Sequence, residues 1–564
     1  MMEVAHHYVV VGQDYINGLC EGKPAWEIVV KTATATIVIY YLKDFLWQDV
    51  SLFERGKRTF FRLARKIPAV RDKIKEEISK IELDMTKEMN ENINNGDYII
   101  SLPQTGMSNE QILAETAKYT AYGKYNWKMG SSSGTVYNCN SALTDLMTKV
   151  YGMSAWTNPL HPDVFPGVRK MEAEVIKMVC TMFNGGPEAC GTMTSGGTES
   201  IILACKAYRD WAINVRGIKR PEMVVPSTVH AAFDKGAALL NMNIKHVPVD
   251  PVTMKVDVAA MKRMISRRTC MIVGSAPQFP HGVIDDIEAI GALGEKYGIP
   301  VHVDACLGGF LIPFMEDAGY KLPLFDFRAA GVTSISCDTH KYGYAPKGSS
   351  VIMYKEPSWR RHQFFVTPNW PGGIYATATI AGSRSGAIVA ACWASMVYHG
   401  RHGYVTYTKK ILQTAKKIEE SCNKIQGIFV LGKPDVSVVA LGSEDFNIYQ
   451  IADEMTQRGW NLNALQFPSC IHIAVTTLHT EEGVAERFCN DLQEIVAKFF
   501  KDPPKDGGGS AAIYGMAQSI PDRSLVNEIA WCYLDSVYST EKSQEEEESS
   551  EHKLNGDVKI NGKP

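Results

Sequence analysis

The sequence lacks the signatures of several large classes of protein. Its 564 residues include 59 basic and 62 acidic side chains, so the net charge is −3, and the chain has no basic excess that would favour nucleic acid as a partner. The 13 cysteines form no CxxC pair, and no cluster of cysteine and histidine has the spacing of zinc ligands. We therefore predict no metal site, and the scattered cysteines indicate reduced thiols in a cytosolic compartment.

The commonest phosphate-binding motifs are also missing. Neither GxxxxGK[ST] nor GxGxxG occurs in the chain. The hydrophobic fraction is 45%, an ordinary value, so a chain of this length can bury a sizeable core in one large domain with one or two smaller pieces.

One apolar segment, at residues 26–47, stands out near the N-terminus. A membrane-spanning helix needs about 20 mostly apolar residues, whereas the uninterrupted run here covers only residues 32–42, between Lys31 and Lys43. Lysines near helix ends can reach the interface, and the flanking tryptophans suit a membrane boundary. A buried amphipathic helix of a soluble protein is the alternative interpretation.

The segment that follows favours a membrane anchor. Residues 55–75 are rich in Lys and Arg, a composition typical of the cytosolic side of a span, and no small-residue cleavage site follows the apolar run. We predict a short luminal N-terminus over residues 1–25, a single anchor helix over residues 26–47, and a body in the cytosol.

The body of the chain has the alternating pattern of an α/β fold. A basic and then polar helical region, residues 48–133, leads into it. Between residues 134 and 386, four short apolar runs end in polar residues, and an amphipathic helix at residues 285–298 separates the middle two. The predicted strands are residues 223–230, 270–277, 299–306 and 333–340. This alternation predicts a large domain with a mostly parallel sheet and right-handed crossovers.

A smaller C-terminal αβ domain is predicted over residues 387–540. Its pattern is a strand at residues 435–443, a helix at about 448–458 and a strand at 470–477, and residues 501–510 read as a linker. The last segment, residues 541–564, is polar and acidic with almost nothing to bury. We predict that it is disordered.

Four side chains with chemical potential fall at the ends of the predicted strands, namely His230, Asp304, His340 and Lys341. Ligands of parallel α/β sheets bind beyond the carboxyl ends of the strands. Each side chain also has an ordinary explanation. His230 is explained as a core histidine, Asp304 as a helix N-cap or a metal ligand, and Lys341 as one more exposed base.

The sequence SGGTES, residues 195–200, precedes a strong helical pattern. Backbone N–H groups of Gly196 and Gly197, with the hydroxyl of Thr198, suit an anion at a helix N-terminus. A plain capping loop explains the same residues. These features together are more specific than any one of them. A cofactor with an aldehyde, a phosphate and a pyridine nitrogen needs four partners in the protein: a lysine of lowered pKa, an anion loop, a stacking side chain and a carboxylate. Pyridoxal 5′-phosphate fits this set.

Longer stretches of the sequence resemble the sphingosine-1-phosphate lyase family. The stretches that carry the resemblance are residues 158–174, 194–200, 275–285, 302–310, 338–350 and 372–384. The resemblance implies a fold-type-I pyridoxal-phosphate enzyme that forms homodimers with active sites at the subunit interface. It also implies a single-pass anchor in the endoplasmic reticulum membrane, with the catalytic domain in the cytosol.

The resemblance further implies roles for individual residues. Lys341 would hold the cofactor covalently, His230 would stack on its ring, and Asp304 would pair with its nitrogen. The cofactor phosphate would contact His340, Gly196, Gly197 and Thr198 and, from the neighbouring subunit, Gly382 and Ser383. A substrate-phosphate site would contain Tyr137, His161 and Lys347, and Tyr375 would be a further acid–base group.

The implied reaction is the retro-aldol cleavage of a phosphorylated sphingoid base between C2 and C3, which gives a long-chain aldehyde and phosphoethanolamine. Two other functions remain open from the sequence. A pyridoxal-phosphate amino-acid decarboxylase would share the fold and Lys341. A membrane-tethered binding protein with a dead site would share the N-terminal segment.

Overall fold

The computed structural model describes residues 13–18, 20–46, 52–93, 98–504 and 523–540. Within these residues the chain forms two compact units. The smaller unit contains the N-terminal helices and the last helix, and the larger unit contains all three sheets of the described residues. The helices of the larger unit are α5 (Asn109–Thr120), α6 (Ser141–Ser154), α7 (Pro166–Met182), α8 (Gly197–Asn214), α9 (Ala232–Leu240), α10 (Val258–Met264), α11 (Ile287–Tyr297), α12 (Pro357–Arg361), α13 (Gly386–Cys422), α14 (Ile448–Gln457) and α15 (Val484–Lys501).

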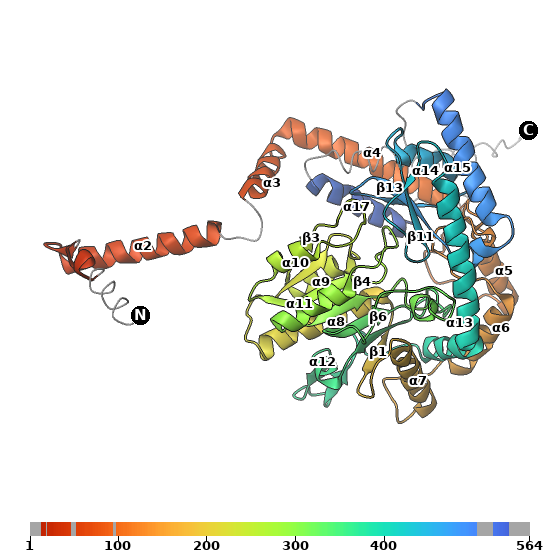
Figure 1. Cartoon of the computed structure of the whole chain (residues 1–564), viewed down its shortest axis with the longest axis horizontal. Coiled ribbons are helices and arrows are strands. Elements are labelled where there is room, and N and C mark those ends of the chain that lie inside the picture. Colours follow the sequence, from red (N-terminus) through yellow and green to blue (C-terminus); the bar gives the residue numbers. More distant parts are fainter. Residues whose placement is uncertain (1–12, 19, 47–51, 94–97, 505–522, 541–564) are drawn as a thin grey trace, which may run out of the picture. The chain divides into compact units, whose positions relative to one another are not determined.

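A seven-stranded sheet forms the centre of the larger unit (Figure 1). Its strands, in spatial order, are β1 (Cys190–Thr194), β7 (Ser350–Tyr354), β6 (Val332–Cys337), β5 (Val301–Asp304), β4 (Thr269–Ser275), β2 (Glu222–Pro226) and β3 (Asn243–Val247). Only the two pairings made by β7 are antiparallel, so the other six strands run in one direction. This confirms the predicted mostly parallel sheet.

Both faces of this sheet are covered, because successive side chains along its strands enter different cores. On β4, Met271 and Val273 pack in a cluster with residues of α8 and α9, such as Phe233. Ile272, between them, packs in the other cluster with residues of α7 and α11. A strand buried on both faces is apolar throughout rather than alternating. Burial on both faces therefore explains the continuous apolar runs from which the strands were predicted.

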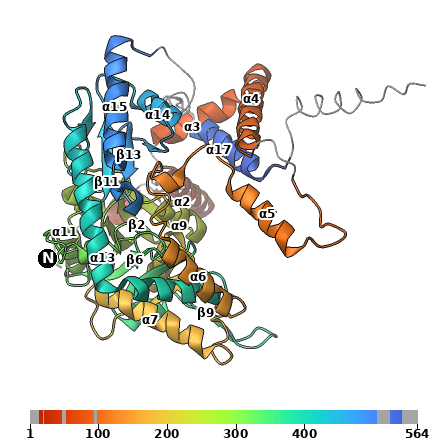
Figure 2. The same ribbon diagram turned by 90° about the vertical axis from the view of Figure 1, so that its right-hand side faces the viewer.

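A four-stranded antiparallel sheet makes up the core of the C-terminal part. Its order is β10 (Phe429–Val430), β11 (Val438–Gly442), β13 (Cys470–Ala474) and β12 (Asn463–Leu465). Helices α14 and α15 lie beside it (Figure 2), and both bury one apolar side. The long helix α13 enters this region from the large sheet and kinks at Gly400, which has a φ of 54°. A third, two-stranded sheet pairs β8 (Phe365–Thr367) with β9 (Tyr375–Thr377).

The observed strands are shorter than the predicted ones, with two consequences for the site. Strand β6 ends at Cys337, so His340 lies in the turn after the strand and the prediction that it ends the strand is wrong. Strand β2 ends at Pro226, so His230 does not end a strand, and the prediction that it does is wrong. The chain turns after β2, and His230 lies just before α9. Proline ends the strand here since it has no N–H to donate to a ladder. Residues 505–510 of the predicted linker and the predicted tail, 541–564, lie outside the described residues.

The smaller unit contains α2 (Ala25–Leu46), α3 (Leu52–Ala64), α4 (Pro68–Asn92) and α17 (Arg523–Tyr538). Helix α2 covers nearly the whole of the predicted anchor, residues 26–47. None of the helices in the described part of the chain combines the length and the apolar character needed to cross a membrane. An ion pair joins Arg65 to Glu528 of α17.

The approach of α11 to the large sheet depends on a glycine. A Cβ at Gly291 would collide with the backbone carbonyl oxygen of Ala330, whereas a Cβ at Gly167 on α7 would meet no heavy atom within 4 Å. We predict that Gly291→Ala destabilises the fold by about 2–4 kcal/mol, since backbone has to move. The matched change Gly167→Ala should leave stability equal or slightly higher. Thermal unfolding of the two variants tests this, and equal midpoints would contradict it.

Candidate active site

A cavity of about 340 Å³ opens beyond the carboxyl ends of β1 and β6. Because these strands are parallel in the sheet, the loops that follow them meet at one edge. The residues that line the cavity are Ser195, Gly196, Gly197, Thr198, Glu199, Ile201, His230, Cys306, Asp338, His340 and Lys341. Six of the predicted site residues are therefore brought together in one place.

The start of α8 forms one wall of this cavity. Gly196 is the N-cap residue and offers no side-chain cap, so the first N–H groups of the helix are available to an anion. Ser195 is fixed by its N–H and hydroxyl, which both donate to Glu199 Oε2 at 2.7 Å. A Cβ at Gly197 would lie 2.8 Å from both carboxylate oxygens of Asp338. Only glycine fits between the helix start and this carboxylate.

Lys341 is held by a buried ion pair on the opposite wall. Its Nζ lies 2.9 Å from Oδ2 of Asp338, whose side chain is 2% exposed. Burial lowers the pKa of Lys341, but the Asp338 carboxylate and, to a lesser degree, Tyr137 outweigh burial, so this pKa is raised above its ordinary value. The prediction of a lowered lysine pKa is wrong for this reason. The pKa of Asp338 is lowered, because Lys341 and His340 outweigh the effect of burial.

His340 is oriented by the loop that precedes β7. Its Nδ1 accepts a hydrogen bond from the N–H of Ser349 at 3.2 Å, and its Nε2 lies 3.7 Å from Asp338. Burial lowers the pKa of His340, although Asp338 opposes the effect. A Cβ at Gly196 would lie 3.4 Å from the ring. The imidazole therefore lies against the anion cradle at the start of α8.

Asp304 and His230 reach the site in different ways. Asp304 ends β5 as predicted, and its Oδ1 accepts from the N–H of Cys306 at 3.0 Å and from the hydroxyl of Ser336 at 3.4 Å. Asp304 itself is not among the cavity-lining residues, whereas Cys306 is. His230 lines the cavity, and its Nδ1 accepts from the N–H of Ala232 at 3.1 Å.

Two of the three predicted substrate-phosphate residues lie together near Lys341. The ammonium of Lys347 is 4.8 Å from the centre of the Tyr137 ring, and Tyr137 interacts electrostatically with Lys341. Burial raises the pKa of Tyr137 to about 12, so the phenol stays protonated at neutral pH. Burial and the neighbouring Lys341 lower the pKa of Lys347. The group concentrates positive charge beside the cavity.

The remaining predicted residues form a separate group in the same chain. Ser383 Oγ accepts from Asn158 Nδ2 at 3.1 Å, and Asn158 begins the turn that carries His161. A Cβ at Gly382 would collide with the hydroxyl of Tyr375. None of His161, Tyr375, Gly382 and Ser383 is among the described residues that line the cavity. One chain therefore does not bring these four residues to Lys341.

Sequence reasoning gave no role to five of the residues that line the cavity, and three of them, Asp338, Glu199 and Cys306, contact predicted residues or the anion loop. Asp338 lies three positions before Lys341, and its isolation in an apolar strand end, SCD, was the available signal. Glu199 holds Ser195 and also accepts from the N–H of Ile380 at 2.9 Å, a contact across 181 positions that no local pattern reveals. Cys306 follows Asp304 by two positions and had no signal beyond that.

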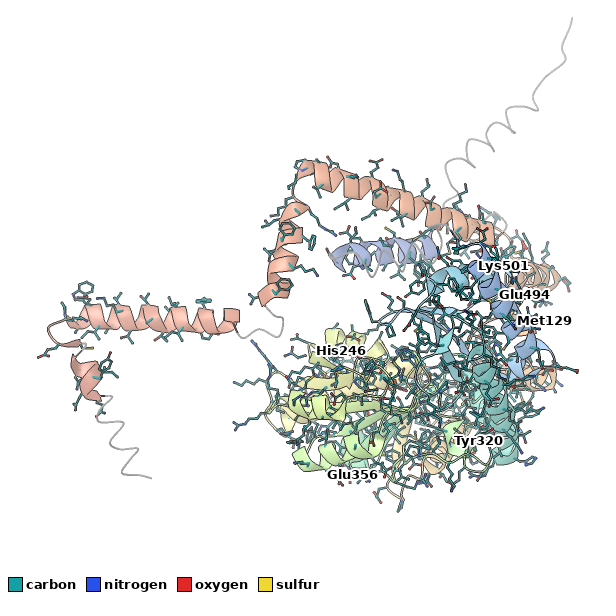
Figure 3. All side chains as sticks on the ribbon, turned by 45° about the horizontal axis from the view of Figure 1, so that its top comes forward. Met129, His246, Tyr320, Glu356, Glu494 and Lys501 are labelled. Carbon is teal, nitrogen blue, oxygen red and sulfur yellow. The ribbon has the colours of Figure 1, made fainter. Side chains whose placement is uncertain are left out.

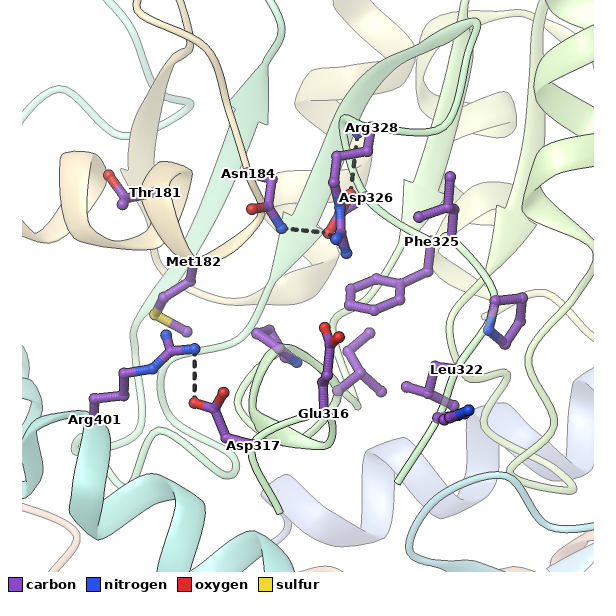
Figure 4. A pocket seen from close by; sticks show the side chains of 15 residues that line it. Thr181, Met182, Asn184, Glu316, Asp317, Leu322, Phe325, Asp326, Arg328 and Arg401 are labelled. Atoms are coloured by element: carbon purple, nitrogen blue, oxygen red, sulfur yellow. Dashed lines mark hydrogen bonds and ion pairs between the residues drawn. The ribbon is translucent and has the colours of Figure 1, made fainter. Parts of the chain in front are cut away.

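A second cavity, of about 400 Å³, lies elsewhere in the larger unit (Figure 4). It is bordered by the ion pair of Arg401 with Asp317 at 2.7 Å and by the hydrogen bond from Asn184 to Asp326 at 2.8 Å. It holds none of the predicted site residues.

The residues of the first cavity fit pyridoxal 5′-phosphate. Gly197 leaves room where a Cβ would collide with Asp338 and Cys306, and the uncapped helix start accepts a phosphate. Lys341 supplies the amine, and Asp304 supplies a buried carboxylate. A lysine, an anion cradle and a carboxylate at one sheet edge define a pyridoxal-phosphate-dependent enzyme.

Comparison with known proteins agrees with this class. The model of the pyridoxal-dependent decarboxylase conserved domain matches residues 97–442. Sphingosine-1-phosphate lyase of Drosophila melanogaster is 51% identical over 536 residues, which cover 94% of this chain and 98% of the relative. Sphingosine-1-phosphate lyase 1 of Rattus norvegicus is 49% identical over 541 residues, or 96% of this chain and 95% of the relative.

A solved structure leads to the same family. Sphingosine-1-phosphate lyase of Burkholderia pseudomallei matches with a TM-score of 0.69 and 39% identity, over 72% of this chain and 98% of that one. A glutamate decarboxylase of Lactobacillus brevis matches with a TM-score of 0.63 at 20% identity, which supports the fold alone. The chain belongs to the sphingosine-1-phosphate lyases, within the pyridoxal-dependent decarboxylase family.

The ion pair of Lys341 generates a prediction about pH. In Asp338→Asn the carboxylate is gone and burial remains, so the pKa of Lys341 should fall below its ordinary value. In cofactor-free protein, the pH at which Lys341 becomes half-reactive towards an acylating reagent should drop by at least about 1 unit. Peptide mass spectrometry measures this, with the exposed Lys355 of the same digests as a control. An unchanged profile would mean that Asp338 does not hold the charge of Lys341.

Proposed function

We propose that this chain cleaves phosphorylated sphingoid bases between C2 and C3, to give a long-chain aldehyde and phosphoethanolamine. Support comes from the identity of about one half to named sphingosine-1-phosphate lyases over nearly the whole chain. The observation that carries the proposal within the site is the cavity that joins Lys341 to the helix start at Gly197. Pyridoxal phosphate, when bound there, supplies the electron sink for the charge left at C2.

The residues of the cavity have separate tasks in this proposal. Lys341 binds the cofactor, and Asp338 Oδ2 is the base within hydrogen-bond reach of its Nζ, at 2.9 Å. Asp304 would pair with the pyridine nitrogen, and the N–H groups at the start of α8 would hold the phosphate. Lys347 and Tyr137 bind the phosphate of the substrate by charge and by hydrogen bonding.

Two rival functions are less well supported. An amino-acid decarboxylase would need no phosphate site beyond that of the cofactor, whereas the pair of Lys347 and Tyr137 adds a cation next to Lys341. A dead binding protein would have no reason to keep Lys341 paired in the cavity. The products separate the three, because only the proposed reaction yields phosphoethanolamine and an aldehyde from a phosphorylated sphingoid base, as detected by mass spectrometry.

The covalent role of Lys341 gives the next prediction. The purified protein should absorb visible light and should lose this band on reduction with borohydride. Peptide mapping should then place the reduced pyridoxyl group on Lys341, since this amine lies in the cavity. Lys341→Ala should carry no adduct and should have no lyase activity. Lys347→Ala is the matched control, which should keep the adduct and lose affinity for the phosphorylated substrate. An adduct on Lys347 in the wild-type protein would contradict the assignment.

We further propose a homodimer in which each cavity is completed by Tyr375, His161, Gly382 and Ser383 of the partner. Two observations support this. In one chain these residues do not line the described cavity, and the hairpin that carries Tyr375 exposes large apolar side chains. Phe365 is 54% exposed, Val366 59% and Ile374 79%, an apolar patch of the kind that protein interfaces cover.

Complementation tests the shared site. Lys341→Ala and Ser383→Asp should each be inactive as homodimers, the first without its nucleophile and the second with a negative charge near the cofactor phosphate. In a heterodimer both defects fall in one cavity and the other is intact. An equal mixture should therefore recover about one quarter of wild-type sites.

The control for this test pairs Lys341→Ala with Asp304→Asn. Lys341 lines the cavity of its own chain, and Asp304 contacts Cys306 of the same cavity, so every site of the heterodimer has a defect and activity should stay absent. Differently tagged subunits establish that heterodimers form. Tagged heterodimers of the first pair without activity would contradict a role of Ser383 across the interface.

The N-terminal segment leads to a proposal about location. We infer that the chain is held at the endoplasmic reticulum membrane by residues 26–47, with the catalytic domain in the cytosol. The apolar run and the basic residues 55–75 after it support this inference. A membrane location suits a substrate with a long alkyl tail, which partitions into the bilayer.

A further inference from the structure

Helix α3 carries large apolar side chains that face water. Phe53 is 79% exposed, Phe60 65% and Leu63 55%. Positions seven and ten residues apart lie on one side of a helix, because the repeat is about 3.6 residues. These three residues therefore form one apolar stripe on α3. Figure 3 draws the side chains of the smaller unit as sticks on the ribbon.

The other side of α3 is basic. Arg55 and Arg62 are seven residues apart, and both lie roughly opposite Phe53 around the helix axis. The sequence of the helix, LFERGKRTFFRLA, contains four basic residues and a single acidic one. Lys66, which follows the helix, is exposed. Helix α3 is therefore short, strongly sided and positively charged.

This combination distinguishes α3 from both a core helix and a spanning helix. A core helix buries its apolar stripe, whereas the stripe of α3 is more than half exposed at each of its three positions. A helix of 13 residues is about 20 Å long, too short for a bilayer core of about 30 Å. Amphipathic helices with a basic polar side and aromatic residues on the other side lie in the plane of a membrane surface.

We propose that α3 is an interfacial helix that binds an anionic lipid surface, with Phe53, Phe60 and Leu63 inserted below the headgroups. The charge decides between this surface and a second copy of the chain. Lys57, four residues after Phe53, lies at the edge of the stripe. Two α3 helices paired through their stripes would bring the two Lys57 side chains towards the same contact, whereas anionic headgroups neutralise them. The proposal concerns α3 alone and holds whether or not residues 26–47 anchor the chain.

Hydrogen exchange of the full chain tests the proposal at the helix itself. Peptides covering residues 52–64 are followed with vesicles of phosphatidylcholine alone and with vesicles that also contain phosphatidylserine. We expect exchange in α3 to slow by at least about tenfold with phosphatidylserine, and this protection to weaken at high salt. Tethering through residues 26–47 alone would give equal exchange in both vesicles, and that result would overturn the proposal.

Matched variants on α4 distinguish the effect of the α3 stripe from the effect of removing any exposed apolar or basic side chain. Leu63→Ser should reduce the protection, whereas Leu83→Ser on α4, at an almost equal exposure of 54%, should not. Phe53→Ser with Phe60→Ser should abolish it. Arg62→Glu should weaken it more than the same charge reversal at the exposed Lys75 of α4.

Two readings keep the outcome unambiguous. The cofactor absorption band and the exchange of β5 report whether each variant is folded.

Protection of α3 that appears without vesicles and increases with protein concentration would mean that a second copy covers the stripe, and would overturn the proposal. Loss of lyase activity with α3 protection intact would count against the proposed reaction and leave this inference standing.

Discussion

The buried ion pair between Lys341 and Asp338 is the interaction on which the rest of the site depends. Removing an ammonium and a carboxylate from water is costly unless the two remain paired at close range. Their 2.9 Å contact meets this condition, and each charge moves the pKa of the other in the direction that keeps both ionised. The pair keeps the amine charged and in place in a cavity that would otherwise favour its neutral form. Asp338 in turn limits its neighbours, because a Cβ at Gly197 would collide with it. The carboxylate that pairs with Lys341 therefore also requires glycine at position 197, at the start of α8.

The sheet explains why these distant segments meet. Strands β1, β5 and β6 run in one direction, and β7, inserted between β1 and β6, is antiparallel to both. The insertion leaves the carboxyl ends of β1 and β6 at the same edge while separating them by one strand. Gly197 and Lys341 follow these two ends, and the Asp338 carboxylate reaches from the loop after β6 to the start of α8. Pyridoxal phosphate would be held between these two loops, by the N–H groups at the start of α8 and by Lys341.

The sequence predicted the parts of this arrangement that depend on local pattern. Strands β2, β4, β5 and β6 were identified from apolar runs, because a strand buried on both faces is apolar throughout. Helices α8 and α11 were identified from helical spacing, because a helix buried on one side has apolar residues at that spacing. Strands β1, β3 and β7 were missed. Strand β1 has the sequence CGTMT, whose small and polar residues are buried only because neighbouring elements cover them. The position of His230 failed because β2 ends at Pro226 and residues 227–229, which lack glycine, form a turn before His230. Asp338 was missed because its importance comes from a partner three residues away in a turn, and a turn has no periodicity to read.

The cavity within one chain defines the chemistry of the class, whereas the substrate is selected by residues around it. Lys341, Asp304 and the start of α8 would serve any reaction that leaves a negative charge next to the substrate nitrogen, and the shared fold with a glutamate decarboxylase at 20% identity is consistent with that. Selectivity for a phosphorylated substrate requires additional positive charge at a fixed distance from the nucleophile. We propose Lys347 for this role, since its ammonium lies over the Tyr137 ring and the neighbouring Lys341 contributes to the lowered pKa of Lys347. An anion bound between these amines would relieve their mutual repulsion. The repulsion between Lys341 and Lys347, which Asp338 only partly offsets, therefore favours the binding of a phosphorylated substrate.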